Sequence, residues 1–201
     1  MRAEEPADRD LEALMEVFER HEVEYVVIGG VAARARGWLD PTADVDLTPE
    51  RSKENLSRLA DALEELGAGF RVDPQHYPRG FRPPGGIDWR TFRNQASIAL
   101  TTARGHLDIV LMPSGIDGYE QLRAGASRER LRGTEIAVPV ASAEMILKSK
   151  TAADRPKDHA VLDRMRDILN PLSPRAGHEP WSSRERSERS RGWYEPPDRG
   201  R

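Results

Sequence analysis

The hydrophobic and polar positions in the first third of the chain predict helices and strands in alternation. Apolar residues recur every three to four positions over 9–21 and 49–66, as on the buried face of an amphipathic helix. Residues 23–28 form a short apolar run and residues 44–48 alternate aspartate with apolar residues, and both patterns are typical of strands. A short helix over 30–37 is expected between the two strands.

Capping residues mark the expected ends of the longer helices. Thr48 as an N-cap and Pro49 as a first helical residue predict the start of one helix, and Gly67 predicts its end. Ser142 and Pro156 are expected to begin two further helices, which form a C-terminal pair. The apolar residues expected on the buried side of the last helix are Val161, Leu162, Met165, Ile168 and Leu169.

The second half of the chain adds more strands after an irregular segment. Residues 73–89 are rich in proline and glycine, which predicts a long functional or mobile loop. Residues 97–102 and 107–112 predict a β-hairpin, followed by a helical stretch over 116–131 and a strand over 135–139. The whole order predicts an α/β (α+β) domain, with a small mixed sheet flanked by helices.

Composition divides the chain into one domain and a tail. The 201 residues are 37% hydrophobic, which is enough for a core, and the net charge of −3 gives no global basic field. We expect a folded domain over 1–170 and a disordered polar tail over 171–201, where Arg, Glu, Ser and Pro dominate. Without cysteine, disulfides and thiolate metal sites are excluded. No apolar run approaches the roughly 20 residues of a membrane span, so a cytoplasmic protein without membrane contact is expected.

The most informative chemical feature is the pair Asp44 and Asp46. Side chains at i and i+2 of a strand point the same way, and two carboxylates about 4 Å apart repel by roughly 4 kcal/mol at an effective dielectric near 20. A hard cation such as Mg²⁺ would relieve that repulsion. Asp108 lies within the apolar run 107–112 and is the third candidate. The alternative is that all three carboxylates are simply solvated, with Asp108 on an edge strand.

Two other groups of residues are candidates for phosphate binding. Gly29 and Gly30 precede an expected helix start, where free backbone N–H groups favour anions, although the pair also suits a tight turn. A charged cluster lies where the last two helices meet, and its members are Lys148, Lys150, Arg155, Lys157 and Asp158. Lys150 could neutralise a phosphate, while a solvated face is the simpler interpretation.

These motifs resemble the nucleotidyltransferases of the DNA polymerase beta-like superfamily. The similarity lies in Gly29-Gly30 and Thr42-x-Asp44-x-Asp46, followed by an acidic strand. A downstream element over 146–158, with a lysine, an arginine and then Lys-Asp, is similar to the minimal bacterial group that includes the AbiEii and MenT toxins. Together these features extend over about 9–170.

The resemblance implies Mg²⁺-dependent (or Mn²⁺-dependent) transfer of an NMP from an NTP to RNA, including the 3′ end of tRNA, or to a protein. It implies that Asp44, Asp46 and Asp108 are metal ligands and that Asp108 also orients or deprotonates the acceptor hydroxyl. Lys150 and Asp158 would be the downstream functional pair. Nucleotide contacts would come from the residues Gly29, Gly30, Thr42, Lys150 and Arg155. A cognate antitoxin is the further partner that the toxin group implies.

The chain also departs from the pattern of this family. Asp40 stands where an arginine is common, and Arg34 and Arg36 are the candidates to replace its charge. The competing hypotheses are a catalytically degenerate binding module on the same fold, which Asp40 favours, and a metal-dependent phosphohydrolase that uses the same carboxylates to activate water.

Overall fold

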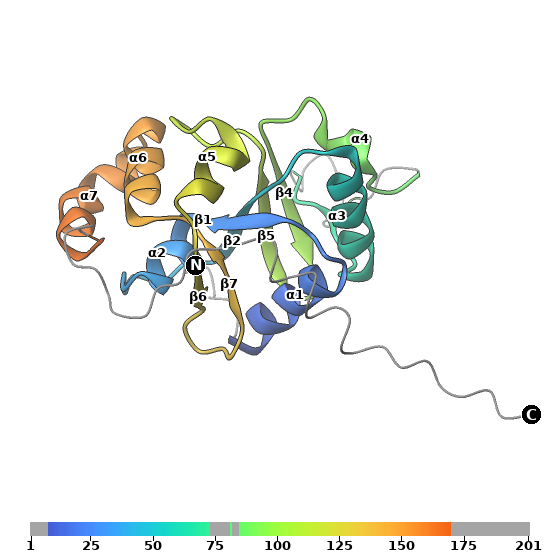
Figure 1. Cartoon of the computed structure of the whole chain (residues 1–201), viewed down its shortest axis with the longest axis horizontal. Helices are drawn as coiled ribbons and strands as arrows, with labels where there is room; N and C mark the ends of the chain where they lie inside the picture. Colours follow the sequence, from blue (N-terminus) through green and yellow to red (C-terminus); the bar gives the residue numbers. More distant parts are fainter. Residues whose placement is uncertain (1–7, 73–80, 82–84, 170–201) are drawn as a thin grey trace, which may run out of the picture.

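A computed structural model describes residues 8–72, 81 and 85–169, and its centre is a mixed sheet (Figure 1). The sheet has seven strands in the order β3-β4-β5-β2-β1-β7-β6. The strands are β1 (Tyr25–Ile28), β2 (Asp44–Pro49), β3 (Gly69–Phe70), β4 (Ser97–Thr102), β5 (Gly105–Val110), β6 (Ser127–Arg130) and β7 (Ala137–Val140). β2 pairs parallel with β5 and antiparallel with β1, so the sheet is mixed, as the sequence predicts.

Helices pack around this sheet and enclose one hydrophobic core. They are α1 (Asp8–Arg20), α2 (Gly29–Ala35), α3 (Lys53–Glu65), α4 (Trp89–Phe92), α5 (Gly118–Ala124), α6 (Ala143–Ala153) and α7 (Pro156–Leu169). In Figure 1 the expected pair α6 and α7 lies beside α2, while α3 and α4 lie together on the other side of the molecule. Fully buried residues such as Phe18, Leu47, Leu59 and Ile109 join α1, α3 and the central strands. In the described ranges, no helix is long and apolar enough to cross a membrane.

The prediction of the helix start at Thr48 and Pro49 is wrong. Both residues belong to β2, where Thr48 is fully buried and Pro49 lies opposite Tyr25 of β1. The N-cap is Ser52, whose hydroxyl accepts a hydrogen bond from the backbone N–H of Asn55. Pairing with β1 extends the strand as far as Pro49, where the missing N–H is tolerated because a proline at the end of a strand removes only one hydrogen bond from the ladder.

Other expectations are met in part. The segment over 116–131 is helical only as far as Ala124, and residues after the break at Gly125 form the edge strand β6 paired with β7. Ile168, expected on the buried side of α7, is 41% exposed. Ser142 caps α6 as expected, by accepting from the backbone N–H of Met145. The tail over 171–201 lies outside the described residues, as do 73–80 and 82–84 of the expected loop.

Candidate active site

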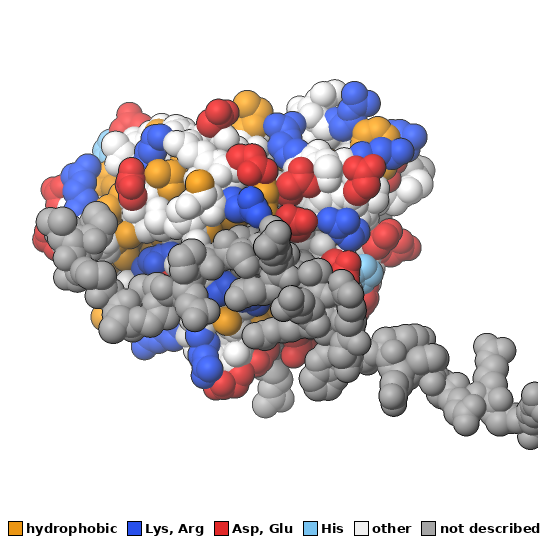
Figure 2. Space-filling model, viewed as in Figure 1, with side chains coloured by type: hydrophobic (Ala, Val, Ile, Leu, Met, Phe, Trp, Pro, Cys, Tyr) orange, Lys and Arg blue, Asp and Glu red, His pale blue; other side chains and the backbone are white. Residues whose placement is uncertain are grey.

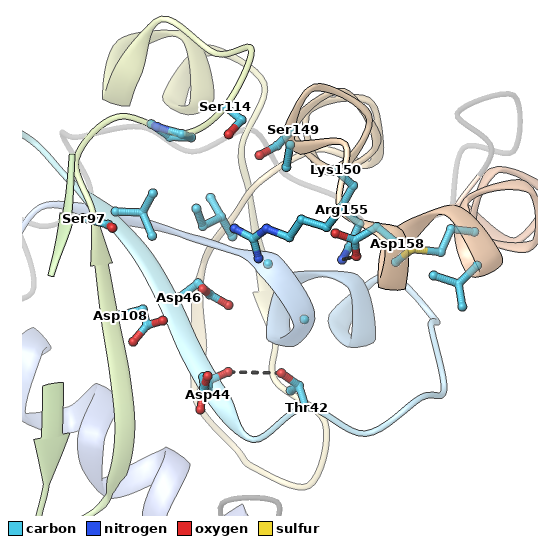
Figure 3. Close-up of a pocket in the computed structure, with 18 of the residues that line it drawn as sticks. Thr42, Asp44, Asp46, Ser97, Asp108, Ser114, Ser149, Lys150, Arg155 and Asp158 are labelled. Carbon is cyan, nitrogen blue, oxygen red and sulfur yellow. Dashed lines mark hydrogen bonds and ion pairs between the residues drawn. The ribbon is translucent and has the colours of Figure 1, made fainter. Parts of the chain in front are cut away.

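Three aspartates lie on one face of two neighbouring strands. β2 and β5 run parallel, with Asp46 directly opposite Asp108 and Asp44 opposite His106. Residues that pair in register present their side chains on the same face of a sheet. Asp44, Asp46 and Asp108 therefore all line one cavity of about 670 Å³ (Figure 3). β5 lies between β4 and β2, so Asp108 is on a central strand and not at the edge of the sheet.

Asp46 is the electrostatically strained member of this group. Burial, followed by the nearby charges of Asp108 and Asp44, raises the pKa of its carboxyl to about 7. A hydrogen bond from the backbone N–H of Gly30 and the charge of Lys150 act in the opposite direction, without cancelling the effect of burial. A carboxyl with this pKa gains much from a cation at its side, because a cation favours the charged form.

Arg71, which the sequence analysis did not single out, joins the other two aspartates. Its Nη2 donates to Asp108 Oδ1 at 2.7 Å and its Nη1 donates to Asp44 Oδ1 at 3.2 Å. Burial raises the pKa of Asp108, and the Arg71 guanidinium opposes that rise. The residue follows the two-residue strand β3, which is too short to leave a periodic pattern in the sequence. The one available signal is an arginine that closely follows the helix end at Gly67.

Close packing within the site explains why positions 29 and 30 are glycines. Gly29 has a φ of +66°, and a Cβ on it would lie 2.1 Å from Asp46 Oδ2. A Cβ on Gly30 would lie 2.4 Å from the hydroxyl oxygen of Thr42. Thr42 in turn donates to the backbone carbonyl of Asp44 at 3.2 Å (Figure 3). The two glycines therefore let β2 and the segment before it approach the start of α2 closely.

The C-terminal pair of helices closes the cavity on the side opposite β5. Lys150 of α6 donates to Asp158 of α7 at 2.8 Å, and Asp158 is only 5% exposed. Figure 3 shows the Arg155 side chain reaching from the start of α7 across the cavity toward Asp46. Of the expected charged cluster, Lys150, Arg155 and Asp158 line the cavity; the side chain of Lys157 lies outside the described residues.

We expect Lys150→Met to destabilise the fold by about 3 kcal/mol, because Asp158 would stay buried without its partner. This is at the lower end of the cost of breaking a buried pair, since the Lys150 side chain is 23% exposed. Urea unfolding measures the change. The double variant Lys150→Met/Asp158→Asn should recover most of the loss, and a double variant as unstable as the single one would show that the pair is not the cause.

Arg34 and Arg36, which were expected to replace the positive charge missing at position 40, do not line the cavity. Arg36 donates to Ser127 and Glu129 of β6 and to the backbone carbonyls of Val140 and Ala141, so it fastens α2 to the far edge of the sheet. That part of the expectation is wrong, and Arg34 is not among the residues that line the cavity. Asp40 itself lines the cavity and accepts two hydrogen bonds from Arg164 of α7.

The donor chemistry of the cavity fits a divalent cation. Asp44, Asp46 and Asp108 provide carboxylate oxygens on one face. The raised pKa of Asp46 shows that burial and the two neighbouring carboxylates disfavour its charged form, which a cation would favour. As the side chains stand, no three His, Cys, Asp or Glu residues within the described part of the chain are close enough to hold a metal ion. Arg71 takes up an oxygen of Asp44 and one of Asp108 in this arrangement.

Comparison with known proteins identifies the fold. No protein-family model matches the chain, and no curated protein does. Among solved structures, the lincosamide antibiotic adenylyltransferase LnuA bound to lincomycin is 17% identical, with a TM-score of 0.55, over 82% of this chain and 99% of that one. ANT(2″)-Ia in complex with adenylyl-2″-tobramycin is 18% identical, with a TM-score of 0.51, over 83% of this chain and 89% of that one.

A third similar structure is an antigenic nucleotidyltransferase-like protein from Paracoccidioides brasiliensis. It is 19% identical, with a TM-score of 0.51, over 83% of this chain and 76% of that one. Identities this low establish the fold and leave the activity to be argued from the site. The chain has the nucleotidyltransferase fold, which confirms the fold class that the sequence predicts.

Proposed function

We propose that this chain is a Mg²⁺-dependent (or Mn²⁺-dependent) nucleotidyltransferase that moves an NMP from an NTP to an acceptor hydroxyl. The proposal rests on one observation: Asp44, Asp46 and Asp108 lie on the same face of the sheet and line one cavity of a nucleotidyltransferase fold. Lys150 and Arg155 line the same cavity and supply positive charge on its other side. Carboxylates facing cations across a cavity of this size suit a metal-bound triphosphate.

In the proposed reaction the acceptor oxygen attacks the α-phosphorus of the NTP. A P–O bond forms to the acceptor, the bond between the α-phosphorus and its bridging oxygen breaks, and pyrophosphate leaves. Asp44 and Asp46 would hold the divalent cation, which would supply positive charge to the triphosphate oxygens. Asp108 takes the proton from the acceptor hydroxyl. Lys150 and Arg155 neutralise charge on the departing pyrophosphate.

We place the acceptor hydroxyl in RNA because of a basic cluster around Trp89. Lys53, Arg90 and Arg93 each put their charge 4.8 to 5.4 Å from the centre of the Trp89 ring. In Figure 2 basic side chains gather around an apolar one over α4, whereas acidic and basic side chains alternate over most of that face. An aromatic ring among cations is the kind of surface that binds single-stranded nucleic acid.

This cluster is connected to the cavity through Arg51. Arg51 donates to the backbone carbonyl of Arg93 at 3.3 Å. Arg51 and Met112 both line a smaller hollow of about 300 Å³, and Met112 also lines the main cavity. An acceptor strand that runs from Trp89 to the carboxylates would therefore pass Arg51, the one basic residue among the described residues that line the smaller hollow, and the acidic lining residues Glu50, Asp117 and Glu120.

We expect the double variant Lys53→Gln/Arg93→Gln to raise the KM for RNA about tenfold at low salt and to leave the KM for NTP unchanged. Removing two phosphate contacts should reduce the slope of log K against log salt by about 1.4, at about 0.7 for each contact with a single strand. Kinetics of RNA labelling at several salt concentrations measure both effects. An unchanged KM for RNA would show that the cluster around Trp89 does not bind the acceptor.

The direct test of the function uses each α-labelled NTP with Mg²⁺ and four acceptors: total RNA, bulk protein, lincomycin and tobramycin. Label in RNA supports the proposal in full. Label in protein, or in either antibiotic, supports nucleotidyl transfer but shows that the acceptor is that molecule and not RNA. The antibiotics are included because two similar structures are antibiotic adenylyltransferases. Labelled NMP or phosphate released without an acceptor would favour a phosphohydrolase, and NTP binding without label would favour a degenerate binding module.

A role as the toxin of a toxin–antitoxin pair, with a cognate antitoxin as its partner, is supported by the resemblance to the AbiEii and MenT group. The same resemblance supports the 3′ end of tRNA as the acceptor. Fractionating the RNA that becomes labelled tests the second of these predictions, since label should concentrate in tRNA.

A further inference from the structure

Arg71 is held at the level of the catalytic carboxylates by the sheet itself. Its backbone N–H donates to the carbonyl of Ala99 at 2.8 Å, which continues the pairing of β3 with β4. Ala99 is opposite Asp108, and Asp108 is opposite Asp46. These residues form one row across four strands, with their side chains on one face.

To reach the aspartates, the Arg71 side chain must cross β4. In the order of strands, β4 separates β3 from β5, and β5 separates β4 from β2. Strands are about 4.8 Å apart, so only a long side chain spans the distance, and the small Ala99 leaves the way across β4 open. Arg71 lines a separate hollow of about 270 Å³ that shares Ser97 with the main cavity. The guanidinium thus approaches the carboxylates from the β4 side.

The two contacts of the guanidinium are unequal. The one with Asp108 measures 2.7 Å, and that side chain is 24% exposed; the one with Asp44 measures 3.2 Å, and that side chain is 36% exposed. A shorter and less exposed contact is the stronger of two charge-assisted hydrogen bonds. Asp44 is also the aspartate that lies two residues from Asp46 on the same face of β2.

We propose that Arg71 is a positioning residue that keeps its contact with Asp108 while it yields Asp44 to the divalent cation. The inference rests on the proposed function, in which Asp44 and Asp46 bind that cation. In this role Arg71 affects both the binding of the cation and the orientation of Asp108. Its positive charge weakens cation binding, since like charges close together repel. Its Nη2 contact fixes one oxygen of Asp108 and leaves the other for the acceptor hydroxyl.

The experiment is a calorimetric Mn²⁺ titration of the whole chain, compared with the kinetics of transfer. Arg71→Gln removes the charge and shortens the side chain, so that neither contact with the aspartates remains, and we expect it to bind Mn²⁺ about tenfold more tightly than the original chain. Arg71→Lys keeps the charge on a single ammonium that cannot bridge two carboxylates. It should therefore bind Mn²⁺ as the original chain does, while its kcat falls with that of Arg71→Gln.

The control is Arg130→Gln. Arg130 is the last residue of β6, at the opposite edge of the sheet, and forms an exposed ion pair with Glu135, so neither Mn²⁺ binding nor kcat should change. If Arg71→Gln binds Mn²⁺ no more tightly than the original chain, or if Arg71→Lys retains full kcat, the inference is overturned. The titration needs no acceptor, so it can support the role of Arg71 even if the transfer assay fails. If neither the original chain nor Arg71→Gln binds Mn²⁺, both this inference and the proposed function are overturned.

A thermal unfolding series guards against a variant that simply fails to fold. In EDTA, Arg71→Gln should melt at a lower temperature than the original chain, because Asp44 and Asp108 lose their counter-charge. Saturating Mn²⁺ should raise its melting temperature by more than it raises that of the original chain. An equal Mn²⁺-induced rise in the two proteins would count against competition between Arg71 and the cation.

Discussion

Asp46→Asn is expected to lower the rate of nucleotide transfer by about 10³-fold or more. Asparagine keeps the shape of the side chain and its acceptor for the Gly30 N–H, but it loses the negative charge that would hold a divalent cation. Loss of the cation removes the positive charge that stabilises the transition state of phosphoryl transfer. Labelled NTP and the best acceptor from the transfer assay measure the rate.

The same substitution should stabilise the protein in EDTA at pH 8. The pKa of Asp46 is raised from 3.8 to about 7 in the folded chain. As the pH rises from 4 through 7, the unfolded chain releases this proton before the folded one does, so the folded chain loses stability over that window. Asparagine does not titrate, so the variant should be more stable above pH 7, by roughly 4 kcal/mol at most, and equal to the original chain near pH 4.

Asp61→Asn is the matched control for both measurements. Asp61 is exposed on α3, so its replacement should change neither transfer nor the pH dependence of stability. Adding Mn²⁺ at pH 8 should reverse the order of stability, because only the original chain gains from the cation. An Asp46→Asn variant that still transfers nucleotide at a rate near the original would refute the assignment of the metal site.

Asp108→Asn is expected to reduce kcat by about 10²- to 10⁴-fold, the usual contribution of a general base. Asp44 and Asp46 remain on their strand, so Mn²⁺ and NTP should bind within a few-fold of the original chain. In the original chain kcat should also fall as the pH falls, since the raised pKa of Asp108 means that acid protonates the base. The variant should lack this dependence.

The split between kcat and binding decides the role of Asp108. If Mn²⁺ affinity falls as steeply as kcat, Asp108 acts as a cation ligand and the acceptor proton leaves by another path. If kcat stays within tenfold of the original, neither role holds. Arg71 remains beside the variant asparagine, so a change in melting temperature in EDTA reports how much of the effect comes from that lost ion pair.

The sequence predicts the central part of the site because local patterns encode it. The spacing of Asp44 and Asp46 on a strand, and the position of Asp108 within an apolar run, suffice to suggest that they meet. Strand pairing then places Asp46 opposite Asp108. Ser142 at the start of α6 is likewise a local signal, since an N-cap bonds to its own helix.

The features that the sequence does not reveal depend on contacts between distant segments. Thr48 and Pro49 carry a strong helix-start signal, yet pairing with β1 overrides it. Arg36 and Arg71 differ from other arginines only in what lies near them: β6 for the first, and the carboxylates of two candidate site residues for the second. Neither contact follows from spacing along the chain, because the partners are 27 to 105 residues away.

The most direct measurement is an anomalous diffraction map from crystals soaked with Mn²⁺ and a non-hydrolysable NTP. We expect a manganese peak within about 2.2 Å of carboxylate oxygens of Asp44 and Asp46, in contact with the triphosphate, with Arg71 still bound to Asp108. A triphosphate seated in the cavity without manganese at these two aspartates, or manganese bound elsewhere, would contradict the proposed site.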